Sequence, residues 1–157
     1  MNAVTVLALA LGPAAPAAKD AGGGDTAALQ GAWAVEAYTM AGLRAPAVVL
    51  ADMGVAVDGD VLKAGPTPAA TYRAGGEVAW GLEPGPDFRV KLDPAAGPRR
   101  VELWVDTPDG PKAYPGIYRV DGDRLPICYA TGGDRPGEFR AGSGSARVLI
   151  ELRRRNR

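Results

Sequence analysis

The residues that could do chemistry in this 157-residue chain are few. It contains no histidine and a single cysteine, Cys128, which lies in the apolar stretch 125–130. A disulfide within the chain and a zinc site built from cysteine and histidine are therefore excluded. A nucleophilic cysteine needs a neighbouring base, and histidine, the usual base, is absent. We therefore expect Cys128 to be a buried, unreactive thiol.

The other nucleophile and phosphate-binding patterns are also missing from the sequence. The only two serines, Ser143 and Ser145, lie in a Gly-Ser-Gly-Ser stretch, which differs from the G-x-S-x-G nucleophile elbow and predicts a flexible loop. A phosphate-binding loop follows a strand, and no strand is predicted before the three glycines at 22–24. Carboxylates are then the remaining acid–base candidates.

Most aspartates adjoin glycine or proline, which is typical of turns. Glu36 and Glu102 are predicted in the middle of strands, opposite the apolar face. They would line a cavity only if the two faces were reversed, and a solvated face is favoured because charged side chains are rarely buried unpaired. The sequence therefore predicts no catalytic residue, no cofactor and no enzymatic activity.

A repeated pattern, V-D-G-D-x-L, occurs at 57–62 and again at 120–125. Asp-Gly between apolar residues is typical of a tight hairpin turn. A calcium loop would need further oxygen ligands and a closing glutamate, which neither segment supplies. We predict two hairpins and no metal site.

Composition and alternation indicate an all-β fold. Glycine and proline number 22 and 14, and apolar residues alternate with polar ones at 33–37, 101–105 and 148–152. In the first of these strands, Trp33, Val35 and Ala37 are predicted on one face and Glu36 and Tyr38 on the other. Only a short helix, near residues 45–53, interrupts the pattern.

The ends of the chain differ in character from its middle. An apolar run followed by small residues predicts a signal peptide at 1–18, with an alanine-rich disordered tail as the alternative. The run is shorter than the roughly 20 residues of a membrane span. Residues 19–28 read as a flexible linker, 29–154 as the folded domain and 155–157 as a basic tail. The predicted location is periplasmic or extracellular.

Eighteen basic and eighteen acidic side chains cancel, so the whole chain offers no field that would attract nucleic acid. Four of the basic groups lie in the arginine-rich end, 153–157. We interpret this end as a solvated terminus that aids solubility. A nucleic-acid arm and binding to an anionic envelope surface are the weaker alternatives.

Several segments together resemble a known family. They are Leu-Gln-Gly-Ala-Trp at 29–33, the piece 92–103, the block 116–130, Arg-Pro-Gly-Glu-Phe at 135–139 and the closing 149–153. They resemble a small exported, lipocalin-like domain of unknown function that is abundant in Planctomycetes and related bacteria. The resemblance brings no established activity, cofactor or catalytic residue.

The resemblance implies an antiparallel lipocalin-like β-barrel of about eight strands. In such barrels a Gly-x-Trp on the first strand closes one end, and an arginine from the last strand lies across the indole. Gly31, Trp33 and Arg153 occupy the corresponding places. Such a contact contributes about 0.5–2 kcal/mol. The alternative is that Trp33 is ordinary core and Arg153 an ordinary solvated charge.

Two functions remain open for such a barrel. It would bind a small hydrophobic molecule, with Trp33, Trp80 and Trp104 lining or filling the interior, and the sequence assigns no ligand-binding residue. Alternatively, it would be a cell-envelope structural or protein-interaction module with a filled core, whose partner would be an envelope protein. We expect neither nucleic acid nor a membrane span.

Overall fold

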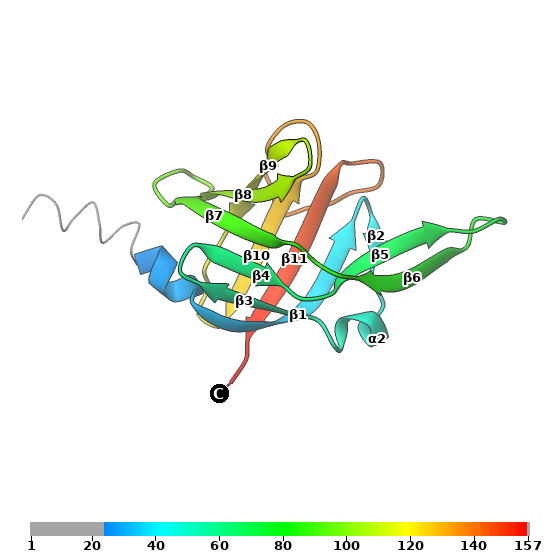
Figure 1. Ribbon diagram of the computed structural model, residues 1–157, viewed down its shortest axis with the longest axis horizontal. Helices are drawn as coiled ribbons and strands as arrows, with labels where there is room; N and C mark the ends of the chain where they lie inside the picture. The colour runs from blue at the N-terminus through cyan, green and yellow to red at the C-terminus, as the bar shows by residue number, and fades with distance from the viewer. Residues whose placement is uncertain (1–23, 157) are drawn as a thin grey trace, which may run out of the picture.

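Alternating apolar and polar side chains bring eight antiparallel strands into one closed barrel (Figure 1). The computed structural model describes residues 24–156. Around the barrel the order is β11, β10, β9, β8, β7, β4, β3, β1, and β1 pairs again with β11. The prediction of an all-β barrel of about eight strands is confirmed. The strands are β1 (Gly31–Met40), β3 (Gly54–Asp58), β4 (Val61–Ala64), β7 (Asp87–Asp93), β8 (Arg100–Thr107), β9 (Gly110–Tyr118), β10 (Arg124–Ala130) and β11 (Arg147–Arg154).

The barrel closes at a seam between its first and last strands. Along this seam Trp33 lies opposite Arg154, and Met40 lies opposite Val148. Because every barrel strand has a neighbour on both sides, the sheet has no continuous open edge. A two-residue strand, β2 (Leu43–Arg44), adds a short antiparallel pair to the far end of β1.

Strand β8 shows how the alternation positions the core. Val101 and Leu103 are buried inside the barrel, while Glu102 and Trp104 lie on the outer face. The other strands contribute in the same way to one cluster of buried side chains, which includes Val35, Val57, Leu62, Leu125, Ile127, Val148 and Leu152.

The alternation predicted for β1 ends at a β-bulge. The register with β11 shifts between Val35 and Ala37, so Glu36 is an extra residue in β1. Beyond the bulge Tyr38 lies opposite Ile150 and is buried in the interior. The prediction that Tyr38 shares the outer face with Glu36 is therefore wrong, because one extra residue exchanges inside and outside for the rest of a strand.

Both V-D-G-D-x-L segments form tight turns, as predicted. Asp58 pairs with the first residue of β4, and Asp121 pairs with Arg124 across the second turn. Gly59 and Gly122 have φ angles of +62° and +58°, a conformation that favours glycine.

One hairpin lies outside the barrel wall. β5 (Thr67–Tyr72) and β6 (Val78–Glu83) form a separate two-stranded sheet that projects from the barrel between β4 and β7 (Figure 1). The short helix α2 (Ala47–Leu50), which confirms the helix predicted near 45–53, contacts β6 and buries Leu50.

The described chain begins with a helix at residues 24–29, where the sequence predicted a flexible linker up to residue 28. Leu29 at the end of this helix is buried, which explains why the segment is ordered. The predicted signal peptide at 1–18 and the linker residues 19–23 lie outside the described residues. Within residues 24–156 no helix has the length and hydrophobicity needed to cross a bilayer.

Candidate functional site

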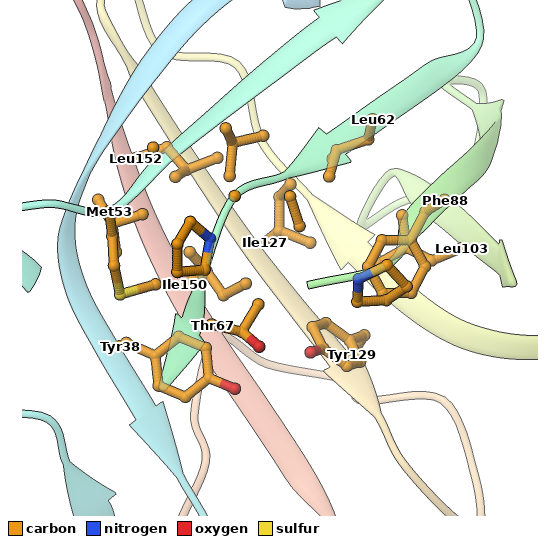
Figure 2. A pocket seen from close by; sticks show the side chains of 17 residues that line it. Tyr38, Met53, Leu62, Thr67, Phe88, Leu103, Ile127, Tyr129, Ile150 and Leu152 are labelled. Atoms are coloured by element: carbon orange, nitrogen blue, oxygen red, sulfur yellow. The ribbon is translucent and has the colours of Figure 1, made fainter. Parts of the chain in front are cut away.

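The barrel interior contains a cavity of about 130 Å³ (Figure 2). Its surface is mostly hydrocarbon, because it is built by the inward-facing residues of the strands. Along β1 it extends from Val35 to Tyr38. The wall residues are Val35, Tyr38, Val55, Leu62, Ala64, Phe88, Leu103, Ile127, Tyr129, Ile150 and Leu152.

Three hydroxyl groups are the polar side-chain groups of this lining. They belong to Tyr38 of β1, Tyr129 of β10 and Thr67 of β5, and Figure 2 shows them directed toward the same part of the pocket. The two tyrosine hydroxyls are close enough for each to affect the pKa of the other. Burial raises the pKa of both tyrosines, and the proximity of Tyr38 raises that of Tyr129 further.

The base of the β5–β6 hairpin forms the rim of the cavity. Gly65 and Pro66 enter the hairpin, Pro86 leaves it, and all three line the pocket. A Cβ on Gly85 would lie 2.3 Å from the carbonyl oxygen of Gly65, so the two connecting segments cross in close contact. The hairpin is therefore held at its base next to the cavity.

Near the start of β1, Trp33 is 0% exposed and belongs to the barrel core. Its indole Nε1 donates a hydrogen bond to the Leu29 carbonyl at 2.8 Å. The Arg154 guanidinium lies over the ring, with Cζ 4.2 Å from the centroid. Arg154 also donates from Nη1 to the Gln30 carbonyl at 2.8 Å and from Nη2 to the Ala28 carbonyl. One side chain thus covers the indole and holds the end of the helix at 24–29.

Arg153, which the resemblance placed across the indole, is not the residue that lies there. Trp33 and Arg154 are directly opposite in the register of β1 and β11, so their side chains share a face. Arg153 points outward, where Nη1 lies 3.2 Å from Oε1 of Glu36. Side chains alternate along a strand, and Leu152 faces inward, so Arg154 faces inward as well and Arg153 faces outward.

The backbone next to Trp33 in β1 and next to Arg154 in β11 is also held in place. Gly31 has a φ of +110°, which side-chain-bearing residues rarely adopt, and it leads from the helix into β1. Beyond β11, the Arg155 amide donates to the Ala32 carbonyl at 3.0 Å, and Nη2 of Arg155 donates to the Met53 carbonyl at 3.1 Å. The predicted solvated tail at 155–157 is therefore bound to the barrel at its first residue.

A charged cluster attaches the helix at 24–29 to the barrel. The hydroxyl of Tyr118 donates to Oδ2 of Asp25 at 2.5 Å, and Nη1 of Arg99 lies 3.1 Å from Asp25. The pKa of Tyr118 is raised well above its ordinary value, first by burial and then by the adjacent carboxylate.

The nucleophile candidates lie apart from the cavity. Cys128 is a free, fully buried thiol, as predicted, and burial raises its pKa. Ser143 and Ser145 lie in the loop between β10 and β11, where the Ser145 hydroxyl donates to the Gly142 carbonyl at 2.6 Å.

The candidate carboxylates lie on the outer face, which confirms the solvated-face prediction. Glu36 pairs with Arg153 and, at 4.0 Å, with Arg124. Glu102 lies 3.4 Å from Arg135. Across residues 24–156, no three His, Cys, Asp or Glu side chains lie close enough to hold a metal ion.

The tryptophans do not contribute to the lining of the cavity. Trp80 lies in the hairpin, and Trp104 lies on the outer face of β8, where its Nε1 donates to Glu102 at 3.3 Å. In the described part of the chain, none of the three tryptophans lines the cavity.

Sequence reasoning did not single out Tyr38 and Tyr129. Tyr129 could have been found, because Leu125, Ile127 and Tyr129 alternate toward the same face of β10. Tyr38 could not, because the bulge that turns it inward leaves no local sequence pattern.

The raised pKa values of Tyr38, Tyr118 and Tyr129 predict a loss of stability at high pH. The folded protein holds these protons more tightly than the unfolded chain, whose tyrosines ionise near pH 10. The stabilisation is therefore complete below about pH 10 and is lost as the pH rises through the raised pKa values. Urea unfolding at several pH values should show this fall.

The substitutions Tyr38→Phe and Tyr129→Phe should each reduce that fall, whereas Tyr72→Phe, at an exposed hairpin tyrosine, should leave it unchanged. If the wild type and the three variants lost stability equally at high pH, the buried tyrosines would not be the cause of that loss.

Comparisons of the chain with known protein families, curated protein sequences and solved structures found no match.

Proposed function

We propose that this barrel is an exported, lipocalin-like domain that binds a small, mainly apolar molecule in its interior cavity. The observation that carries the proposal is an apolar cavity of about 130 Å³ lined by side chains of the barrel core. A cavity of roughly 150 Å³ lined by apolar side chains is large enough to bind benzene. The groups that line it suit binding more than catalysis, since they are hydrocarbon, thioether and hydroxyl groups.

Export is proposed from the sequence of residues 1–18 and from the resemblance to an exported family. The same resemblance favours ligand binding through the fold alone, and function depends on the site and not on the fold. The cavity supplies that site.

A second candidate is an envelope interaction module, favoured by one face of the hairpin. The β5–β6 register places Ala70 opposite Trp80 and Tyr72 opposite Val78 on this apolar face. Tyr72 is 70% exposed, and Leu82 on the same face is also exposed. A substitution that fills the cavity separates the two candidates, because it leaves the hairpin face unchanged.

The substitution Ala64→Phe tests the binding function. Ala64 lines the cavity opposite Val55, so a phenyl ring there would occupy much of the available volume. Calorimetric titration should show saturable toluene binding to the wild type. Binding to Ala64→Phe should be weaker by at least about tenfold, or about 1.4 kcal/mol.

The matched control is Ala56→Phe. Ala56 adjoins Val55 in β3 but is exposed on the outer face, so this variant should bind toluene like the wild type. Equal toluene binding by both variants, or a wild type that binds neither toluene nor phenol, would overturn the proposal.

A further inference from the structure

The size of the cavity restricts the ligand to about one ring. Pockets for drug-sized molecules measure about 300–1,000 Å³, whereas this one measures about 130 Å³. The facing side chains of Phe88, Leu103, Ile127 and Ile150 leave room for a single aromatic ring or an aliphatic group of similar volume.

The hydroxyl groups of the cavity provide one unused donor. Each tyrosine hydroxyl has one hydrogen and two lone pairs, so a hydrogen bond between the neighbouring hydroxyls of Tyr38 and Tyr129 would use only one of the two hydrogens. The remaining hydrogen and lone pairs can donate to, or accept from, an oxygen of the ligand. Thr67, at the rim, carries a third hydroxyl.

The cavity offers no partner to an ionised ligand. Among the described residues, the lining includes no aspartate, glutamate, lysine or arginine. Burial of an unpaired charge in such surroundings costs several kcal/mol, so a carboxylate would be rejected. Burial raises the pKa of both tyrosines for the same reason, because these surroundings disfavour a negative charge.

We propose that the ligand is neutral, has the size of one ring, and carries a single hydroxyl or carbonyl oxygen that is recognised by Tyr38 and Tyr129. This inference rests on the proposed binding function. In this proposal, the tyrosine pair makes the site select a ligand with an oxygen over a hydrocarbon of the same shape. A hydrogen bond to an otherwise apolar ligand provides this kind of selectivity, because the polar groups of the site are then paired.

The test compares phenol, toluene and benzoate, measured by calorimetric titration near neutral pH. Toluene is the more hydrophobic of the two neutral probes and would bind more tightly to a purely apolar cavity. We expect wild-type protein to bind phenol more tightly than toluene and to bind no benzoate. In the double variant Tyr38→Phe/Tyr129→Phe the preference should reverse, with phenol binding weakened by about tenfold.

Tyr72→Phe is the matched control, since Tyr72 is exposed on the hairpin, and it should keep the wild-type preference. Toluene binding that equals or exceeds phenol binding in the wild type would overturn the ligand class but leave the binding function intact. The ligand class would also be overturned if the double variant still preferred phenol to toluene, or if the wild type bound benzoate. If neither phenol nor toluene bound, the proposed function itself would fail.

Discussion

Replacing Trp33 with alanine is expected to lower the free energy of unfolding by about 3–5 kcal/mol. The side chain is fully buried in the barrel core. Its removal leaves a cavity, loses the hydrogen bond to the Leu29 carbonyl and deprives Arg154 of the ring beneath it. Urea unfolding followed by circular dichroism measures the change.

The control for this experiment is Trp104→Ala, on the outer face of β8. Surface substitutions usually change stability by about 0.5 kcal/mol or less, and we expect a value near that limit. If the alanine variant of Trp33 fails to fold, Trp33→Phe provides a measurable value of about 1–3 kcal/mol, because it keeps a ring but loses the N–H donor. Equal effects at positions 33 and 104 would show that burial of Trp33 in the core and its contacts do not stabilise the fold specifically.

Replacing Arg154 with alanine is expected to cost about 2–4 kcal/mol, the sum of a cation–π contact and hydrogen bonds to partly buried carbonyls. Replacing its neighbour Arg153 should cost no more than about 1 kcal/mol, because that residue forms an exposed ion pair with Glu36. The two variants remove the same chemical group from adjacent positions, so their difference measures the contacts of Arg154 with Trp33 and with the Gln30 and Ala28 carbonyls.

Thermal and urea unfolding of both variants decide between the two positions. Added salt should reduce the small effect of Arg153→Ala more than the larger effect of Arg154→Ala, because exposed charges are screened more strongly. A larger loss at position 153 than at 154 would contradict the described seam and restore the assignment implied by the family resemblance.

Local sequence patterns were sufficient to predict much of the barrel. Period-two alternation at 101–105 and 148–152 identified β8 and β11, and the Asp-Gly turns located two hairpins. Both patterns depend only on near neighbours in the chain, as strand alternation and turn geometry do. The closed barrel was instead implied by the family resemblance, which placed Arg153 and not Arg154 against Trp33.

The parts that were missed depend on pairing between distant segments. The bulge in β1 is defined only by its register with β11, and it decides that Tyr38 faces the interior. The correct seam residue, Arg154, follows from extending the alternation of β11 by one step past Leu152. The cavity depends on how seven strands and the base of a hairpin pack together, which no single segment of the sequence encodes.

The most direct measurement is the crystal structure of the protein soaked in phenol. We predict one phenol ring inside the barrel, in contact with Ile127 and Ile150, and its oxygen within hydrogen-bonding distance of the Tyr38 or Tyr129 hydroxyl. A barrel whose interior is filled by its own side chains, or phenol found only on the outer surface, would contradict the central claim.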